Sequence, residues 1–348
     1  MRLATYNVEW FTELFSRDNR LLLDNEWSRR YKVTRREQGE AIAHVMRRVD
    51  ADMMFIVEAP NTGHRASTVT ALEGFARHFN LRQSKTIMGF ANETHQELAV
   101  MYDPSVVSML HDPQGNVSEG RRPRTAPRFD GKFLYDVDLD GKADAHMFSK
   151  PPLELLVEVK GTKGMFRMIG VHTKSKSTYG ADTPEEELQL LIDNRRKQLA
   201  QCIWIRQRVD AHLDAGDPLV VLGDFNDGPS ANGLEGLFAR SGVEIVMGEK
   251  KDAGCRCLVE PHAEIQLDPH HGWVMATARF YSAQYKRYLN ALLDYIMLSQ
   301  DLSDATQADW RIWHPFDDPE CFNDRKMQEA LLTASDHFPV TVDMQFSL

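Results

Sequence analysis

Two polar side chains follow an apolar run near the middle of the chain. Residues 219–222 read Leu-Val-Val-Leu, a pattern that predicts a buried strand. Asp224 and Asn226 come next, and because they are two positions apart, an extended backbone points both side chains to the same side. Alone, such a segment is typical of a solvated turn that begins near Asp227. A carboxylate and an amide at the end of a strand can also contribute to a catalytic site, so the rest of the chain decides between the two interpretations.

Further polar side chains stand at or near the ends of other predicted strands: Asn7, Glu58, His172, Asp336 and His337. Each alone has an ordinary explanation as a turn former, a cap or a satisfied polar residue. Asp294 is different because it lies within the apolar run 292–298, and a buried carboxylate needs a partner such as a histidine or a metal ion. Together these stretches fit one site near the strand ends, which favours a catalytic site over separate solvated turns.

The sequence between these groups predicts both strands and helices. Strands are predicted over residues 2–7, 53–57, 98–102, 153–159, 165–171, 219–222, 292–298 and 338–344. Helices are predicted over 41–49 (after a capping box of Thr34 and Glu37), 69–79, 230–240 and, after a cap at Thr183, to about residue 213. Because strands form a hairpin at 153–171 and also follow helices, we expect mixed sheets in one α/β domain.

The composition is typical of a soluble protein with a sizeable core. The chain has 348 residues, 42% of them hydrophobic, and a net charge of −10. This charge disfavours wholesale electrostatic capture of nucleic acid but allows a local basic patch. No apolar run approaches the ~18 residues of a membrane span, and the N-terminus begins directly with a strand rather than a signal peptide. We therefore expect a cytoplasmic protein; the sequence does not indicate its oligomeric state.

The four cysteines are too few for a disulfide framework in a chain of this length. Cys255 and Cys257 lie near His262, His270 and His271, which raises the alternative of a zinc site. Their spacing matches no common zinc finger, so we interpret them as scattered loop residues.

Six segments of the chain together resemble the motifs of one known superfamily. They read ATYNVEW, FIVEAPN, VHTKSK, VVLGDFND, LLDYIMLS and ASDHFPV, in this order, between residues 3 and 344. They are similar to the motifs of the endonuclease/exonuclease/phosphatase superfamily, which has the DNase I-like fold. The HTKSK form resembles the DNase I and bacterial nuclease branches, because the abasic-site endonuclease branch has a tyrosine-containing motif there. One departure is Val57-Glu58, where the family usually has Gln-Glu, so the glutamate is present and the glutamine is absent.

This resemblance implies the fold and the general chemistry. It implies a four-layer α/β/β/α sandwich, in which two mixed β-sheets pack face to face between outer helices. It also implies a single domain over residues 1–348, with the active site at one end, where the loops of both sheets meet. The implied reaction is hydrolysis of a phosphoester with Mg²⁺ or Mn²⁺, hard cations that prefer oxygen ligands.

The resemblance also implies roles for the residues that could hold the metal and activate water. Glu58 is the expected direct ligand, helped by Asn7 and by Asp336. Asp224 and His337 are alternative candidates for orienting and deprotonating the attacking water. Asp294 is expected to hold His337 in its useful tautomer and to favour its charged form.

The remaining polar residues are expected to contact the phosphate. His172 and Asn226 would hydrogen-bond its oxygens, and His172 is also a candidate acid for the leaving group. An acidic residue supports the equivalent histidine in DNase I. Glu97 is a candidate for that role here, and Gln96 competes with it.

The substrate class is the least determined part of this prediction, because one fold serves many substrates. Basic clusters at 29–36, 121–128 and 174–176 favour a nuclease-like phosphodiesterase, with Arg121, Arg124, Lys174 and Lys176 contacting a phosphodiester substrate such as nucleic acid. The alternative is a phosphodiesterase or phosphatase for a small-molecule or lipid-derived phosphate ester. A non-catalytic binding module on the same fold is disfavoured because no catalytic position is lost.

Overall fold

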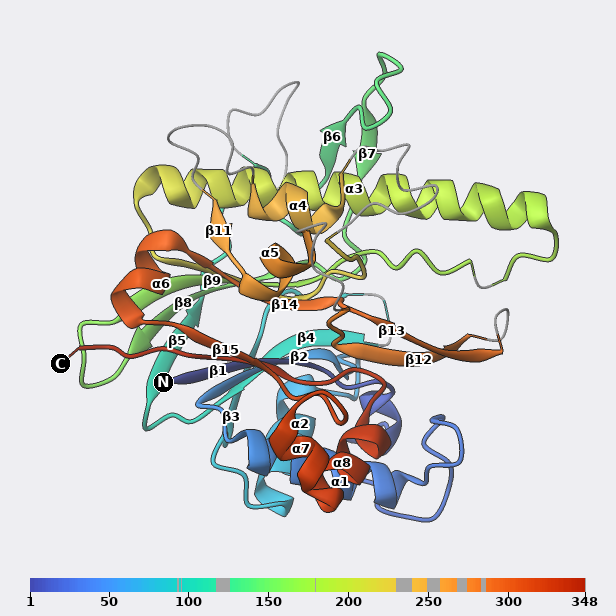
Figure 1. The fold of residues 1–348 in the computed structure, drawn as a ribbon, viewed down its shortest axis with the longest axis vertical. Helices are drawn as coiled ribbons and strands as arrows, with labels where there is room; N and C mark the ends of the chain where they lie inside the picture. The colour runs from blue at the N-terminus through green and yellow to red at the C-terminus, as the bar shows by residue number, and fades with distance from the viewer. Residues whose placement is uncertain are drawn as a thin grey trace.

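Two six-stranded sheets lie at the centre of the computed structural model (Figure 1). It describes residues 1–92, 94, 96–116, 126–178, 180–229, 240–248, 257–267, 274–282 and 286–347. The first sheet has the order β15 (Asp309–Ile312), β16 (Val340–Asp343), β1 (Arg2–Asn7), β2 (Met53–Pro60), β4 (Gln96–Tyr102) and β3 (Lys85–Met88). The second has the order β11 (Leu258–Val259), β14 (Asp294–Ser299), β10 (Leu219–Asp224), β9 (Met165–His172), β8 (Leu153–Val159) and β5 (Val107–His111).

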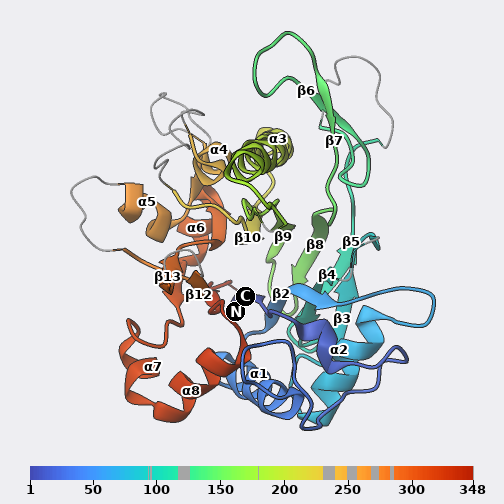
Figure 2. The ribbon, with the colours of Figure 1, turned by 90° about the vertical axis from the view of Figure 1, so that its right-hand side faces the viewer.

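Helices cover the outer face of each sheet, as Figure 2 shows from the side. The first sheet packs against α1 (Arg35–Val49), α2 (Thr68–His78) and α8 (Arg325–Ala334), and the second against α3 (Pro184–Ala215) and α4 (Gly242–Met247). The other described helices are η1 (Phe11–Leu14), α5 (Pro261–Leu267), α6 (Gln300–Thr306) and α7 (Pro319–Asn323). Within the described ranges, each helix is too short or too polar to cross a membrane.

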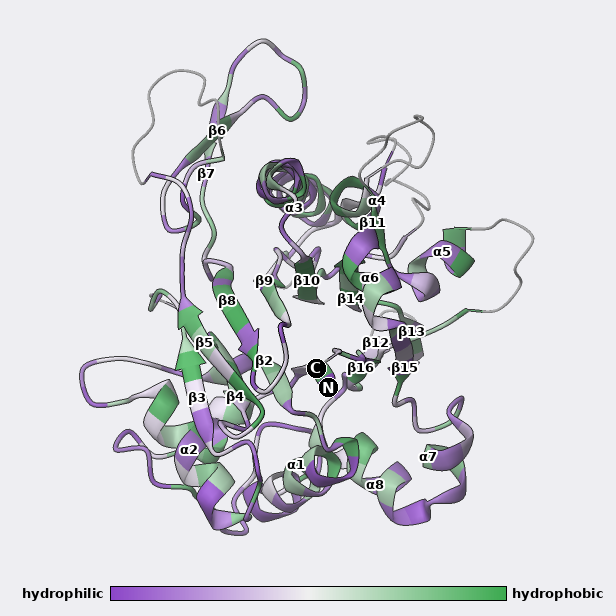
Figure 3. Ribbon diagram, turned by 90° about the vertical axis from the view of Figure 1, so that its left-hand side faces the viewer, coloured by the Kyte–Doolittle hydropathy of each residue, from purple (hydrophilic) through white to green (hydrophobic). Residues whose placement is uncertain are grey.

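The alternation of side chains along the strands separates the layers. Leu3 and Phe55 pack in the core between the sheets, whereas Ala4 and Ile56 pack against the helices of the first sheet. The central strands are mostly hydrophobic, while the helices carry both hydrophobic and hydrophilic residues (Figure 3). Both sheets are mixed, because β1 pairs with β2 and β9 with β10 in parallel and the remaining pairs are antiparallel. The predicted four-layer sandwich with two mixed sheets is confirmed.

Most predicted elements form, with small shifts of their ends. Thr34 and Glu37 make the capping box of α1, and the Thr183 side chain caps α3. One expectation is corrected: Asp294 lies at the start of β14, as its first residue, and not in the interior of the strand. The helix predicted over 230–240 lies almost entirely outside the described residues.

The strand directions bring many of the predicted polar residues to one edge of the sandwich. β1, β9 and β10 end at Asn7, His172 and Asp224, and β2 ends just beyond Glu58. β4, β8 and β14 run antiparallel to β2, β9 and β10, so they begin at this same edge. A hydrogen bond from Asn7 Nδ2 to Asp224 Oδ2, 2.9 Å long, joins the two sheets there.

Candidate active site

Three neighbouring strands of the second sheet place His172, Asp224 and Asp294 side by side. In the register of the sheet, Asp224 is paired with His172 on β9 and with Asp294 on β14. Gly223 precedes Asp224 with a φ of +132°, and a Cβ there would lie 2.0 Å from the carbonyl oxygen of Val171. Only glycine fits this position without a shift of the backbone, so the residue before Asp224 is dictated by the approach of β9.

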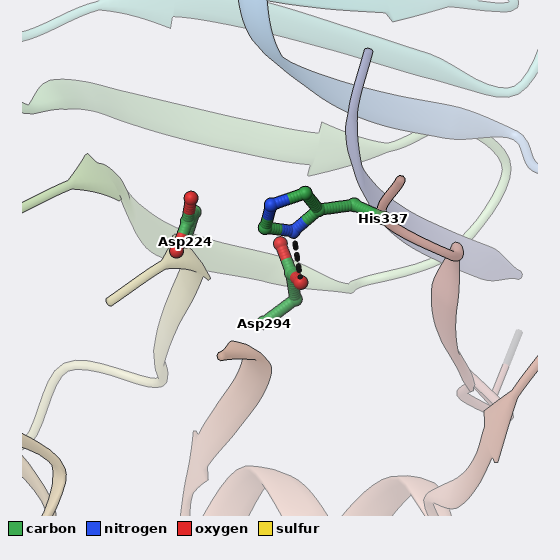
Figure 4. Close-up of side chains that lie close together, drawn as sticks. All are labelled: Asp224, Asp294 and His337. Atoms are coloured by element: carbon green, nitrogen blue, oxygen red, sulfur yellow. Dashed lines mark hydrogen bonds and ion pairs between the residues drawn. The ribbon is translucent and has the colours of Figure 1, made fainter. Parts of the chain in front are cut away.

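Asp294 and His337 form a buried pair. His337 Nδ1 and Asp294 Oδ2 are 2.7 Å apart, and the Thr277 hydroxyl donates to the same carboxylate oxygen at 2.8 Å. Figure 4 shows the other ring nitrogen of His337 turned to the side of Asp224. Burial acts against the charged ring, but Asp294, together with Asp224, raises the pKa of His337 well above its ordinary value. One carboxylate oxygen each of Asp224 and Asp294 and one ring nitrogen of His337 all lie within 4.8 Å of one another.

Asp224 is a fully buried carboxylate held mainly by amides. Its Oδ1 accepts from the backbone amide of Asn226 at 2.7 Å, and its Oδ2 accepts from the side chain of Asn7. His172 Nε2 lies 3.6 Å from Oδ2. Burial, followed by the neighbouring Asp294 carboxylate, raises the pKa of Asp224 to about 7. A carboxylate with this pKa can exchange protons near neutral pH.

His172 has the opposite electrostatic environment. Burial, with Lys150 and His337 nearby, lowers the pKa of His172 well below its ordinary value. Its Nδ1 is buried and has no hydrogen-bond partner among the described residues. A neutral ring with one unused nitrogen can hydrogen-bond a ligand but is a poor acid at neutral pH.

Glu58 lies on the first sheet, at a β-bulge between Val57 and Ala59, with a φ of +62°. Its Oε2 accepts from Gln96 Nε2 at 2.5 Å, and the Trp10 amide also hydrogen-bonds the carboxylate. Burial raises the pKa of Glu58, and the charge of Asp336 acts in the same direction. The bulge re-aims the side chain out of the regular pleat, which places Glu58 where Asp336 and His337 influence it.

The oxygen donors at this edge fit a hard divalent cation. Asn7 Oδ1 and Asp336 Oδ1 are buried, and no described residue hydrogen-bonds either atom. Buried polar atoms are normally satisfied, and Glu58 adds a half-buried carboxylate within electrostatic reach of Asp336. Carboxylate and amide oxygens are the ligands that Mg²⁺ and Mn²⁺ prefer.

Ser335 fixes the loop that carries Asp336 and His337 to the first sheet. Its hydroxyl donates to the carbonyl oxygen of Asn7 at 2.8 Å. The hydroxyl oxygen of Ser335 in turn accepts from the backbone amides of Glu9 and His337, at 3.1 and 3.2 Å. The buried Ser335 side chain therefore fixes the position of Asp336 and His337 relative to the end of β1.

The predicted basic contacts are only partly brought to the site. Lys174 is half-buried and close to Lys150, and burial lowers its pKa. Lys176 forms an ion pair with Asp227, with Nζ 2.9 Å from Oδ1, so its ammonium is already engaged. Arg121 and Arg124 lie outside the described residues.

The zinc alternative gains no support from the described residues. Cys255, His270 and His271 lie outside them. His262 Nδ1 is 2.9 Å from the Glu260 carboxylate, in a contact that uses one of its two ligand atoms.

Glu97 and Gln96 have different partners from those considered in the sequence. Glu97 is fully buried and accepts from the Thr62 amide and from the Asn92 side chain, at 3.3 and 2.6 Å. Gln96 supports Glu58 instead of His172. The glutamine absent before Glu58 in the sequence is thus matched by an amide from the adjacent strand.

Sequence reasoning missed Lys150 and Glu9. Lys150 is half-buried before β8; burial lowers its pKa, and the charges of Glu58 and Asp224 act in the opposite direction. A signal was present, because the predicted hairpin places the residues before 153 beside the end of β9. Glu9 forms an ion pair with Arg30, and burial and Asp336 raise its pKa to about 7. Only the spacing from Asn7 pointed to Glu9.

Several solved structures are similar to this chain over almost its whole length. An endonuclease/exonuclease/phosphatase family protein from Bacteroides thetaiotaomicron is 13% identical with a TM-score of 0.49, covering 100% of this chain and 98% of its own. The 3′ phosphatase NExo from Neisseria, bound to a product DNA hairpin, is 16% identical with a TM-score of 0.48, covering 99% and 100%. The human Nocturnin catalytic domain is 13% identical with a TM-score of 0.47, covering 100% and 94%. Identities this low do not transfer an activity.

A comparison with curated protein sequences gave no match. The model of the Endonuclease/Exonuclease/phosphatase family, in contrast, matches residues 4–337. This range includes every residue of the site described above, and the chain therefore belongs to the endonuclease/exonuclease/phosphatase family.

Proposed function

We propose that this protein is a divalent-metal-dependent phosphodiesterase with nuclease-like activity. The observation that carries the proposal is the meeting of oxygen donors from the first sheet with the Asp224, Asp294 and His337 cluster of the second. Members of the family hydrolyse phosphoesters. We also propose that the chain forms one domain over residues 1–348, which the shared core between the two sheets supports.

The metal would be held by Glu58, Asp336 and Asn7. When bound, a Mg²⁺ or Mn²⁺ ion there supplies positive charge that polarises the phosphoryl group and offsets the charge of the transition state. The unpartnered oxygens of Asn7 and Asp336 support this ligand set. The close cluster of Asp224, Asp294 and His337 is assigned to proton chemistry, because the Asp294–His337 hydrogen bond already occupies one atom of each.

The raised pKa of His337 favours Asp224 as the base. An imidazole that keeps its proton at neutral pH cannot accept another, whereas Asp224, with a pKa of about 7, can take one from water. The charged ring of His337, oriented by Asp294, then stabilises a phosphate oxygen. His172 and Asn226 hydrogen-bond the phosphate, and the lowered pKa of His172 favours this role over that of an acid.

Lys150 and Lys174 extend the cationic part of the site. Both are half-buried, and Lys150 is influenced by the charges of Glu58 and Asp224. A lysine beside metal-binding carboxylates suits a phosphodiester anion that bridges the two. We place both residues among those that bind substrate.

A substrate panel tests the proposed function. Plasmid, single-stranded DNA, RNA, a small diester and a small monoester are offered to the purified protein with Mg²⁺ and with Mn²⁺. His337→Ala serves as the inactive control for contaminating nucleases. We expect polynucleotide and small-diester hydrolysis above that control, and little monoester hydrolysis. A clear preference for a small or lipid-derived ester over every polynucleotide would overturn the nuclease proposal and favour the alternative.

A further inference from the structure

A β-hairpin outside the two sheets begins directly at the proposed catalytic residues. Its strands are β12 (Ala278–Ser282) and β13 (Arg287–Ala291). The Arg279 amide donates to the carbonyl oxygen of Asp336 at 2.7 Å, and the Phe338 amide donates to that of Thr277 at 2.6 Å. Figure 1 shows the hairpin extending away from the sheets from this point. Its base is therefore fixed to the site and its far end projects into solvent.

One face of the hairpin carries a row of aromatic and cationic side chains. The register pairs Tyr281 with Tyr288, and their rings meet edge to face with centroids 5.4 Å apart. The Arg279 guanidinium lies 4.5 Å from the centroid of Tyr288 and 5.3 Å from that of Phe316. We call these four residues, Phe316, Arg279, Tyr288 and Tyr281, the aromatic row.

The aromatic row is exposed although its rings are large and apolar. Tyr281 is 57% exposed, Tyr288 54% and Phe316 42%. Leaving three neighbouring rings in water forfeits the free energy that burial would give. A row of this kind on a surface is typical of a binding site.

The charge of the hairpin indicates an anionic ligand. Residues 272–293 contain Arg279, Lys286 and Arg287 but no aspartate or glutamate, in a chain whose net charge is −10. Of the acidic groups near Phe316, Asp318 and Glu320 pair with Arg311, whereas Asp317 lies beside His314, whose Nδ1 accepts from the Phe316 and Asp317 amides. Phosphates that approach along the two strands of the hairpin, away from residues 317–320, therefore meet its cations.

Exposed aromatic rings next to a guanidinium group can stack on unpaired nucleobases. Each base offers a flat face that can stack on tyrosine or arginine, while the backbone phosphates interact with the cations. In a duplex these faces are stacked on one another and are not available to a protein surface. Tyrosines also occur where proteins meet a lipid surface, so binding to vesicles is measured below as the competing outcome.

We propose that the aromatic row binds the unpaired bases of a single-stranded polynucleotide whose phosphodiester backbone enters the active site. This inference rests on the proposed function and names the substrate class of that site. Because the Arg279 amide hydrogen-bonds the carbonyl oxygen of Asp336, the row would begin near the scissile phosphate and continue outward along the bound polynucleotide.

The test measures binding of a fluorescein-labelled dT20 strand and of a 20-base-pair duplex by anisotropy, in EDTA so that no cleavage occurs. Tyr281→Ala combined with Tyr288→Ala should weaken dT20 binding about tenfold or more. The pair Tyr281→Phe with Tyr288→Phe keeps the rings and should bind like the wild type. Phe280→Ala, on the opposite face of the same hairpin, is the matched control and should also bind like the wild type.

Equal dT20 binding by the alanine pair and the wild type would overturn the proposal, as would a duplex bound as tightly as dT20. Tyrosine-dependent binding to phosphatidylserine vesicles without binding to dT20 would overturn it in favour of a membrane. The single variants Tyr281→Ala and Tyr288→Ala, each expected to lose about threefold or more, keep the test decisive if the pair does not fold. Wild-type hydrolysis of bis(p-nitrophenyl) phosphate with Mn²⁺ separately tests the proposed function, so the two failures are distinguishable.

Discussion

Asp224, the last residue of β10, and Asp227, three positions later, are both almost fully buried and have opposite environments. Asp227 is surrounded by donors: Arg195 Nη1 at 2.6 Å, Lys176 Nζ at 2.9 Å and the Gly242 amide at 2.6 Å. Asp224 accepts hydrogen bonds from the Asn7 side-chain amide and the Asn226 backbone amide. Its partner on the neighbouring strand β14 is another carboxylate, Asp294.

This difference separates an anchor from a reactive group. A buried carboxylate that contacts two cations stabilises its segment of chain only while those partners remain. A buried carboxylate beside another carboxylate keeps an affinity for protons that a catalytic base needs. Burying Asp224 beside Asp294 lowers the stability of the fold. The contacts of Asp227 with Arg195 on α3 stabilise the adjacent segment and offset this loss.

The largest expected effect is on stability, at Asp227. Replacement by Ala leaves Arg195 buried without its carboxylate, which should lower the free energy of unfolding by about 3–5 kcal/mol. Urea denaturation of Asp227→Ala against the wild type measures this. A loss below about 1 kcal/mol would show that Asp227 does not anchor this segment of the chain.

The corresponding change at Asp224 should affect catalysis instead. Asp224→Asn is expected to lower kcat on a small diester by roughly 10²-fold, the scale of a lost general base. Its melting temperature should equal or exceed that of the wild type, because the repulsion with Asp294 is removed. A stable variant with full activity would show that Asp224 is not the base.

Asp294 should act through His337, with a smaller effect. Asp294→Asn is expected to reduce kcat about tenfold or more, because the ring loses the group that orients and charges it. Adding His337→Ala to Asp294→Asn should cost much less than the product of the single losses, since the two residues act as a unit. Full activity combined with easy unfolding of Asp294→Asn would make Asp294 a structural residue.

The last expected effect is a pH dependence of stability in the metal-free protein. Folded Asp224 keeps its proton up to a pKa of about 7, whereas an unfolded aspartate loses it near ~3.9. The folded state therefore binds more protons between these values, and the free energy of unfolding should fall as pH rises from about 4 to about 7. Melting temperatures in EDTA across this range should fall less steeply for Asp224→Asn. Parallel profiles for the two proteins would contradict the raised pKa.

The sequence predicted the fold well because periodicity reports burial directly. The alternation in β1 and the runs in β2, β9 and β10 depend on local patterns, and the motif order carried the topology. The contrast between Asp224 and Asp227 was not predictable, because it depends on Arg195, which lies on α3, 29 residues away from Asp224. Lys150 precedes β8 and Gln96 begins β4, and both were missed or misassigned because only the pairing of neighbouring strands brings them to the edge.

The aromatic row was also beyond the sequence patterns. Residues 243–290 have no clear periodicity, and the row forms from β12, β13 and a separate segment at Phe316. A short two-stranded hairpin gives a weak local signal, and its fixed position depends on hydrogen bonds to Asp336 and Thr277.

Removal and return of the metal is the most direct test of the proposed metal-dependent phosphodiesterase. Hydrolysis of bis(p-nitrophenyl) phosphate is measured after exhaustive treatment with EDTA and again after Mg²⁺ or Mn²⁺ is restored, for the wild type and for Glu58→Gln. We expect wild-type activity to disappear with EDTA and return with the metal, while Glu58→Gln stays at least 10²-fold lower at the same metal concentration. Undiminished wild-type hydrolysis in EDTA, or full recovery by Glu58→Gln, would contradict this expectation.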